Sequence, residues 1–312
     1  MAQLMIGTVG SPEMLTGDIS TRARLVNRVA DSAIDHFFIA DHISFHTGMG
    51  MDGLINAATL TTLAPDMKVL VGVYLLALRH PVAVARQLSS LSASAPGRII
   101  LGIGVGGEDR HEMEICGVDP ARRGIHTTHA MRALKGLMSG ESCSYECDFF
   151  AYEDALIKPA PKPAIPLLVG GRADAAIKRA ALEGDGWLGI WSSTARYASV
   201  VQQIDEIAAR HGRQVDRWQH GLQIWVGTGA NKKEARRFVA EGMEEFYRVP
   251  FEKFERYSPY GSAQEIAEYL IPYIKLGAHT LNLAPRGPSE EMCIETIAEV
   301  SDILKKEFPE LG

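Results

Sequence analysis

Cysteine is scarce in this chain. Only four cysteines occur among 312 residues, namely Cys116, Cys143, Cys147 and Cys293. They are too few and too unevenly spaced for the disulfide framework of a small secreted fold. Cys143 and Cys147 form one C-x3-C pair with no second pair, whereas a tetrahedral zinc site needs four converging ligands. We therefore expect reduced thiols and no metal.

Clusters of basic residues and long apolar runs are also missing. The net charge is -6, and the 32 lysines and arginines are scattered along the chain rather than gathered in a stripe. A nucleic-acid partner is therefore not expected. No apolar run approaches the ~20 residues of a membrane span, and the N-terminus lacks the basic segment and cleavage site of a secretory signal. We expect a soluble, cytoplasmic protein that acts on a small molecule.

What the chain does contain is a regular alternation of short β-rich apolar runs and longer amphipathic stretches. This pattern is typical of parallel βα units. A count of eight strands favours a closed (β/α)8 TIM barrel of the α/β class that spans residues 1–312 as one domain. A doubly wound open sheet would give the same alternation and stays an alternative. The eight candidate strands are residues 4–9, 37–40, 68–76, 98–103, 165–169, 186–190, 221–226 and 280–283.

Two kinds of signal indicate helices: the spacing of apolar residues and the capping patterns at helix starts. Residues 82–92 and 173–183 carry apolar residues at helical intervals. Asn231 and Ser262 are each followed three residues later by Glu, which is the pattern of a capping box. Two stretches interrupt the alternation and predict insertions. One, near 139–163, contains an aromatic β-prone piece that suggests a small hairpin; the other, near 247–260, is aromatic and charged.

Candidate catalytic residues are sought at the strand ends, where barrel enzymes place their chemistry. Asp41 and His42 follow the second strand, and a histidine beside a carboxylate can exchange a proton near neutral pH. The alternative is a polar turn that caps the next segment. The G-x-S-x-G elbow of covalent hydrolases is absent.

Glycines mark three further strand ends. Gly72 interrupts the third strand, where it indicates either a close ligand approach or relief of packing. The loop after the fourth strand, Gly104-Val105-Gly106-Gly107, lets backbone amides approach a phosphate or a flat ring. After the fifth strand, Gly170-Gly171-Arg172 leads into a helix whose first amides suit a phosphate, or form only a tight turn.

In this order the motifs resemble the luciferase-like monooxygenase family, over nearly the whole chain. The most distinctive stretch is Arg79-His80-Pro81, followed by a helix and by Gly97-Arg98-x-x-Leu101-Gly102-x-Gly104-x-Gly106. The other similar segments are Ala40-Asp41-His42, Glu112, Gly117, Gly170-Gly171, Gly184-Asp185-Gly186-Trp187 and Tyr260-Gly261-Ser262.

The resemblance implies a flavin or deazaflavin at the C-terminal ends of the strands, and a homodimer. It implies that His42 faces the reactive ring and that a non-proline cis peptide joins Gly72 and Val73. It further implies that Gly170, Gly171 and Arg172 hold the cofactor phosphate. The other expected cofactor-binding residues are Asp41, Tyr74, Gly104, Val105, Gly106 and Gly107. From their places after the sixth and eighth strands, we expect Trp191 and Arg286 in the substrate pocket.

The cofactor is the open point of the resemblance. Ala40-Asp41-His42 and the glycine loop are closer to members that use coenzyme F420, with FMN as the alternative. Some F420 dehydrogenases carry a catalytic acid where this chain has Val105, and Glu108 is displaced from that position. We expect hydride transfer between coenzyme F420 and a small organic substrate. The alternatives are an FMNH2-dependent monooxygenase that uses O2, and a non-catalytic flavin-binding barrel.

Overall fold

Parallel strands form a barrel in the computed structural model, which describes residues 3–46, 48–107 and 109–311. Within these residues the barrel closes with eight strands in the order β1-β12-β11-β10-β9-β6-β5-β2. The closed barrel is confirmed and the open sheet is excluded. All eight predicted strands are present, with ends displaced by at most two or three residues. Their bounds are β1 (Met5–Val9), β2 (His36–Ile39), β5 (Lys68–Tyr74), β6 (Ile99–Ile103), β9 (Leu167–Gly170), β10 (Gly186–Ile190), β11 (Gly221–Gly227) and β12 (Thr280–Arg286).

Contacts divide the chain into two compact units. The first contains the described residues of Met1–Phe38, Trp187–Glu206 and Gln214–Gly312, and the second contains Ile39–Gly186 and Ile207–Arg213. None of the described helices has the length and apolar character needed to cross a membrane.

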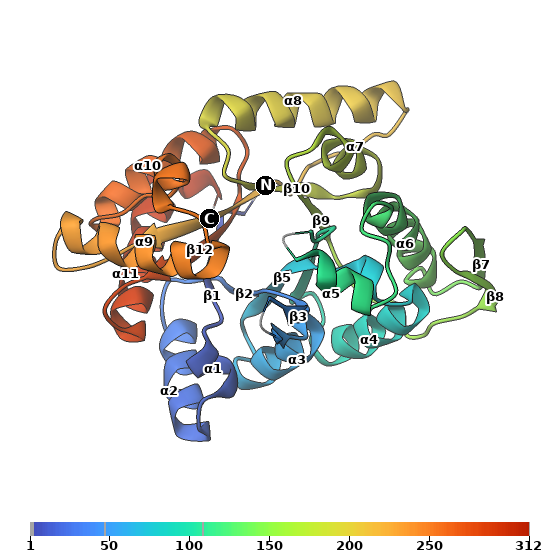
Figure 1. Cartoon of the computed structure of the whole chain (residues 1–312), viewed down its shortest axis with the longest axis horizontal. Helices are drawn as coiled ribbons and strands as arrows, with labels where there is room; N and C mark the ends of the chain where they lie inside the picture. The colour runs from blue at the N-terminus through green and yellow to red at the C-terminus, as the bar shows by residue number, and fades with distance from the viewer. Residues whose placement is uncertain (1–2, 47, 108, 312) are drawn as a thin grey trace. The chain divides into compact units, whose positions relative to one another are not determined.

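In the first unit, β12 lies between β1 and β11, with Thr280 opposite both Met5 and Gly221. The helix α11 packs against α10 on one side and α2 on the other (Figure 1). Its Lys305 anchors it by an ion pair with Asp35, 2.8 Å away. The helices of this unit are α1 (Pro12–Thr16), α2 (Ile19–Ala30), most of α8 (Thr194–Arg210), α9 (Lys232–Tyr247), α10 (Ala263–Lys275) and α11 (Glu290–Glu307), with 3-10 turns η2 (Phe251–Lys253), η3 (Glu255–Tyr257) and η4 (Pro309–Leu311).

In the second unit, β6 pairs with β5 and with β9, so that Leu101 lies opposite Val71 and Leu167. Arg98 donates from one guanidinium nitrogen to the carbonyls of Thr61, Ala64 and Met67, which secures the end of α3. The remaining elements are α3 (Gly53–Leu63), η1 (Leu76–Leu78), α4 (Pro81–Ser94), α5 (Arg110–Ile115), α6 (Arg123–Leu137), α7 (Asp174–Glu183), and the paired strands β3 (His42–Phe45) with β4 (Met49–Met51) and β7 (Cys143–Glu146) with β8 (Ala151–Ala155).

The predicted helix starts are confirmed, one of them with a difference. At Ser262 the side chain and Glu265 complete the reciprocal capping box. At Asn231 the side chain accepts from the N–H of Glu234, but the Glu234 carboxylate accepts from Ala230 N–H, one residue before the cap.

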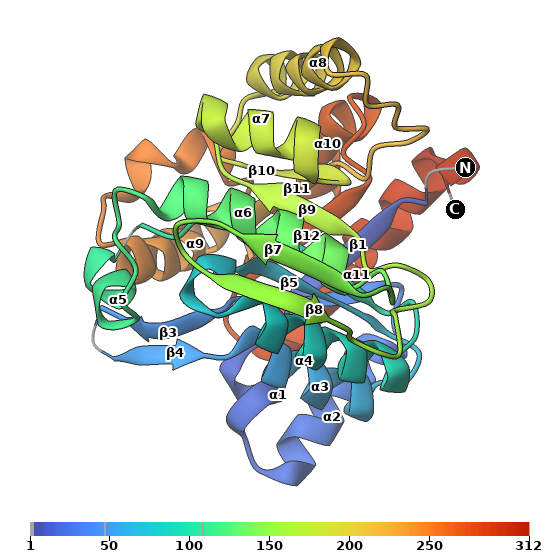
Figure 2. The same cartoon turned by 90° about the vertical axis from the view of Figure 1, so that its right-hand side faces the viewer.

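The insertion near 139–163 contains the predicted hairpin. Its strands β7 and β8 lie across α6 (Figure 2). The hydroxyl oxygen of Tyr145 lies 2.9 Å from Nδ1 of His129. The ring of Phe149 stacks on that of His126, with centroids 4.3 Å apart. The aromatic side chains of this hairpin therefore pack on α6.

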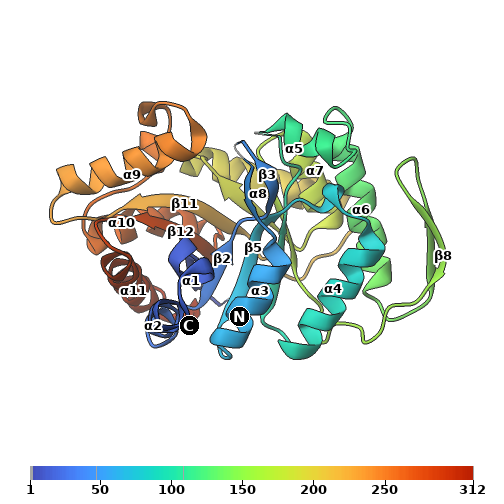
Figure 3. The ribbon, with the colours of Figure 1, turned by 60° about the horizontal axis from the view of Figure 1, so that its bottom comes forward.

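The hairpin of β3 and β4 was not predicted. Its strands have only four and three residues, which is too short for an alternating pattern to stand out in the sequence. It lies beside α5 (Figure 3).

Candidate active site

Asp41 sits at the end of β2 and is almost completely buried, with 1% of its surface exposed. Both carboxylate oxygens accept hydrogen bonds from Arg79, at 2.7 and 2.8 Å. They also accept the backbone N–H groups of Gly53 and Leu75, each at 2.9 Å. This carboxylate joins the ends of β2 and β5 to the start of α3. Because these four hydrogen bonds occupy the carboxylate, only the backbone of Asp41 is left to contact a cofactor.

His42, the next residue, has a hydrogen-bond partner that the sequence did not indicate. Its Nδ1 lies 3.1 Å from Oε2 of Glu112, which is only 2% exposed. The other oxygen of Glu112 accepts the N–H groups of Ile43 and Ser44, at 2.6 and 3.0 Å. An acceptor-only carboxylate requires the His42 proton on Nδ1, which leaves Nε2 of the neutral ring as an acceptor.

The short helix α5 brings Glu112 to this position. Asp109 caps the helix by accepting His111 N–H at 3.0 Å, and its other oxygen accepts His46 N–H at 2.7 Å. The bond from His46 is the main reason why the pKa of Asp109 is lowered. The N-cap carboxylate of Asp109 and the Glu112 carboxylate of α5 thus accept backbone N–H groups of residues 43–46 and fix the helix against that segment.

Val73 explains several glycines of the predicted cofactor site. The peptide bond between Gly72 and Val73 is cis, as expected. The Val73 side chain occupies the space that a Cβ would take at Gly104, 2.3 Å from Cγ2, and at Gly170, 2.9 Å from Cγ1. These two glycines accommodate Val73. The expected reason, close approach of a ligand to their backbone, is not needed to account for them.

Other glycines in this region have a different cause. Gly106, Gly107 and Gly171 adopt positive φ angles of 64°, 123° and 115°, which favour glycine. A Cβ on Gly107 would lie 3.1 Å from Nε of Arg123. This buried Nε has no hydrogen-bond partner among the residues that the structure describes, although Nη1 of the same side chain donates to Pro120. Leaving a buried N–H donor without a hydrogen-bond acceptor is costly, so a bound ligand that supplies an acceptor would satisfy it.

The remaining expected cofactor residues differ in accessibility. Tyr74 is fully buried beneath Arg79, whose guanidinium carbon lies 4.4 Å from the ring centroid. Burial raises the pKa of its hydroxyl. Its side chain belongs to the core, which leaves only its backbone for a ligand. Val105 is half-buried and Arg172 is exposed. Arg172 precedes α7, whose N-cap residue Ala173 supplies no side-chain acceptor to the first turn.

Trp191 and Arg286 lie in the first unit, in one aromatic cluster. Trp191 meets Tyr247 edge-on, with centroids 4.9 Å apart, and Tyr247 meets Trp225 at 5.8 Å. The Arg286 guanidinium stacks on Trp225, 4.2 Å from its centroid. The structure thus joins these two predicted pocket residues through Tyr247 and Trp225. Tyr247 lies in the predicted aromatic segment, but Trp225 was not singled out.

The predicted site residues of the second unit converge at strand ends. The ends of β2, β5, β6 and β9 carry Asp41, Gly72 to Tyr74, the Gly104 loop and Gly170. Glu108 lies outside the described residues. The sequence indicates Glu112 only through the family resemblance, because nothing in a six-residue helix reveals which backbone its side chain will face. Among the described residues no three His, Cys, Asp or Glu side chains gather as metal ligands would.

The fold and site define a (β/α)8 barrel with a histidine held by a buried carboxylate at a strand end. The model of the luciferase-like monooxygenase family matches residues 4–281, and the chain therefore belongs to that family. The predicted membership is confirmed.

Two curated relatives share part of the chain. An uncharacterized protein of Mycobacterium tuberculosis is 37% identical over 113 residues, which cover 36% of this chain and 38% of that protein. The F420-dependent glucose-6-phosphate dehydrogenase of Kineococcus radiotolerans is 29% identical over 199 residues, 59% of this chain and 58% of that enzyme. The match thus spans between about a third and three fifths of these relatives.

Solved structures share the fold at low identity. An F420-dependent secondary alcohol dehydrogenase, solved with an F420-acetone adduct, gives a TM-score of 0.84 at 16% identity, with 97% of this chain and 99% of that chain covered. The FMN complex of the oxygenating constituent of 3,6-diketocamphane monooxygenase from Pseudomonas putida gives 0.77 at 17% identity, with 97% and 98% covered. Relatives of this fold thus include users of F420 and of FMN.

Proposed function

We propose that this protein is an oxidoreductase that transfers a hydride between coenzyme F420 and a small organic substrate, with His42 as its proton-transfer residue. The pairing of His42 with buried Glu112 at the end of β2 carries the proposal. The relatives that act with F420, a sugar-phosphate dehydrogenase and a secondary alcohol dehydrogenase, support it. We also infer a homodimer from the family resemblance, to be tested by light scattering.

His42 is suited to moving a proton at Nε2. Glu112 accepts from Nδ1 and so selects one tautomer, in which Nε2 carries the lone pair. The side chain is 20% exposed, which leaves part of the ring accessible while its other edge is fixed. Oxidation of an alcohol releases a hydroxyl proton together with the hydride, and Nε2 takes that proton. In the reverse direction Nε2 returns it.

The residues present fit the anionic part of such a cofactor. Arg123 offers a buried Nε donor without a partner in the described part of the chain, next to the positive-φ backbone of Gly107. The N-cap residue of α7, Ala173, has no side chain that could accept the first backbone N–H groups of the helix. A phosphate could accept them instead. In this proposal Gly171, Arg172 and the start of α7 hold the phosphate.

The backbone of Gly72 to Tyr74 and the loop from Gly104 to Gly107 would border the ring and its side chain. Arg123 would donate to an oxygen of the cofactor near Gly107. When bound, coenzyme F420 supplies a ring that carries two electrons as a hydride. The protein supplies position, electrostatics and the proton path through His42.

An FMN-dependent monooxygenase is the second candidate. The likeness to the diketocamphane monooxygenase in complex with FMN, which covers 97% of this chain, favours it. Both cofactors carry a phosphate and a polyol chain, so the phosphate-binding features support either one. The identity of the ring separates the two candidates.

Titration of the full chain with coenzyme F420 and with FMN, followed by absorbance and fluorescence, tests the proposal. Tight binding of F420 with weak binding of FMN supports the leading candidate, and the reverse supports the second. Binding of neither overturns both. His42→Ala should reduce turnover far more than cofactor affinity. Unchanged turnover with weaker binding would make His42 a binding residue only.

A further inference from the structure

Arg286, the last residue of β12, is held rigidly inside the first unit. Its guanidinium stacks on buried Trp225, 4.2 Å from the ring centroid. On another side it packs against Gly242, where a Cβ would lie only 2.7 Å from the arginine Nε. Nη1 donates to the carbonyl of Pro285 at 2.8 Å. Stacking, packing and a hydrogen bond thus fix the orientation of this cation before any ligand binds.

Among the residues that the structure describes, no carboxylate lies within ion-pair distance of this cation, and Glu290 and Glu245 act on it only at longer range. The contrast with Arg79 is direct, since that arginine forms ion pairs with Asp41 and Asp52 at 2.7 and 3.1 Å. Burial lowers the pKa of Arg286, as expected where the charged form loses hydration. A desolvated cation with no counterion in contact is costly, and such groups are usually paired. An anion from solution would complete the site.

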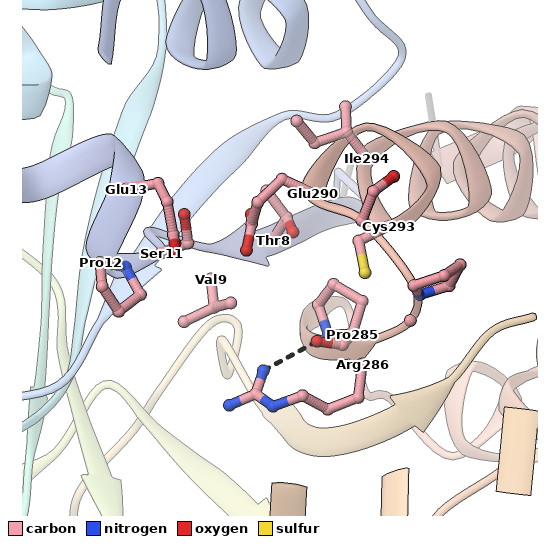
Figure 4. A pocket seen from close by; sticks show the side chains of 13 residues that line it. Thr8, Val9, Ser11, Pro12, Glu13, Pro285, Arg286, Glu290, Cys293 and Ile294 are labelled. Carbon is pink, nitrogen blue, oxygen red and sulfur yellow. Dashed lines mark hydrogen bonds between the residues drawn. The ribbon is translucent and has the colours of Figure 1, made fainter. Parts of the chain in front are cut away.

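A cavity of about 440 Å³ opens beside Arg286. It lies at the carboxyl ends of β1 and β12 and is lined by Thr8, Ser11 and Glu290, with Glu13, Ser289 and Cys293 also on its wall. Figure 4 shows the guanidinium turned toward Val9, with Glu290 on the opposite side of the cavity. Burial raises the pKa of Glu290, whose carboxyl is also bonded to Ser11.

The cavity therefore has a cationic end and a hydroxyl-rich acidic end. Its volume lies within the range of ~300 to 1,000 Å³ that is typical of small-molecule sites. An anion centred near Glu13 and Glu290 would be repelled, so the anionic group of a ligand belongs at Arg286. A hydroxyl or amine at the other end of the ligand would find acceptors in Ser11 and Glu290.

We propose that this cavity binds a small organic anion, whose carboxylate or phosphate pairs with the Arg286 guanidinium and whose polar remainder faces Ser11 and Glu290. The geometry of the first unit alone carries this inference, which does not depend on the redox function proposed above. Guanidinium is suited to the task, because its fork of donors matches two oxygens of a carboxylate or phosphate. Trp225 and Gly242 hold that fork in place.

Equilibrium titration of the full chain, without added cofactor, tests the proposal. The probes are succinate and inorganic phosphate, and the readout is tryptophan fluorescence, since Arg286 stacks on Trp225. Potassium chloride at equal ionic strength is the reference. Saturable binding of either probe is expected, and the better of the two identifies the anionic group. If neither probe saturates beyond the chloride reference, the proposal is wrong.

Arg286→Met tests the role of the cation, because methionine keeps apolar bulk against Trp225 without the charge. Loss of a charge-assisted hydrogen bond predicts binding that is weaker by about tenfold or more. Arg256→Met is the matched control, since Arg256 also stacks on a ring, that of Tyr257, at 4.5 Å but is exposed and outside the cavity. Equal affinity in Arg286→Met and wild type would overturn the proposal.

Two further variants keep the test decisive if Arg286→Met does not fold. Arg286→Lys retains the charge but not the two-pronged geometry, and should bind with intermediate affinity. Gly242→Ala places a methyl group against the Arg286 side chain and should weaken binding by displacing the guanidinium. Affinity unchanged in both folded variants would contradict a site that depends on the orientation of Arg286.

Discussion

Glu112 Oε2 lies 3.1 Å from Nδ1 of His42, although 70 positions of sequence separate the two residues. The carboxylate also binds two backbone N–H groups of the segment that follows His42. It therefore fixes both the backbone and the tautomer of the proposed proton-transfer residue. Glu112 is a positioning residue, because it acts through His42.

Replacement of Glu112 by glutamine tests this positioning role. The amide can donate to Nδ1 of His42, which would favour the tautomer with its proton on Nε2. By analogy with supporting carboxylates of ligand histidines, kcat should fall by roughly 10- to 100-fold, with little change in cofactor affinity. The pH profile of kcat should also shift, which a purely structural role would not produce.

Glu114→Gln is the control for that substitution. Glu114 lies on the same helix but is exposed, with a distant contact to His111 at 3.9 Å. Its replacement should leave kcat and the pH profile unchanged. Equal losses in both variants would attribute the effect of Glu112→Gln to damage of α5.

Asp41→Asn should destabilise the protein strongly. The amide leaves the Arg79 guanidinium without the carboxylate that holds it with two hydrogen bonds in a buried site. Breaking a buried pair costs about 3–5 kcal/mol in free energy of unfolding. Urea denaturation measures this change. In comparison, Glu291→Gln removes an exposed partner of Arg24 and should cost less than about 1 kcal/mol. Similar costs for the two variants would contradict the central place of Asp41.

Gly104→Ala should destabilise the second unit through Val73. The new methyl group would lie 2.3 Å from Cγ2 of Val73, and such overpacking costs about 1–3 kcal/mol. Val73→Ala removes the obstructing atoms, so the same glycine substitution in that background should cost much less. A double-mutant cycle by urea denaturation measures the coupling. Additive costs would show that Gly104 serves another purpose.

His220 should make stability depend on pH. Burial lowers its pKa from 6.5 to about 4, and its Nδ1 accepts the N–H of Trp187 at 3.1 Å. The unfolded chain therefore binds the proton first as pH falls. The contribution of His220 is fully present above pH 6.5 and is lost between pH 6.5 and about 4, by an amount on the order of 3 kcal/mol.

His220→Asn isolates this contribution, because its carbonyl oxygen can replace Nδ1 as the acceptor for Trp187. Urea denaturation at a series of pH values should give a shallower loss of stability for the variant than for wild type. Part of the slope should remain, since burial also lowers the pKa of His279. Identical slopes would mean that His220 is not titrating in this window.

The sequence by itself determined the strands and therefore the barrel. Each buried parallel strand is a short run of apolar residues such as Val69 to Val71, and its local pattern survives in any tertiary context. The glycines and Asp41-His42 could be placed at strand ends for the same reason. Helix starts at Asn231 and Ser262 also depend on neighbouring residues alone, apart from the exact N–H that each glutamate accepts.

Only the tertiary structure decided what those residues touch. Glu112 reaches His42, and Trp225 and Gly242 hold Arg286, because separate segments of chain meet in space. No spacing in the sequence encodes such distances. The position of the Val73 side chain likewise explains why residues 104 and 170 are glycines. A glycine in a sequence motif does not show which neighbour requires it. Asp41 could be predicted as a strand-end carboxylate, but its four donors belong to three residues that the fold alone brings to it.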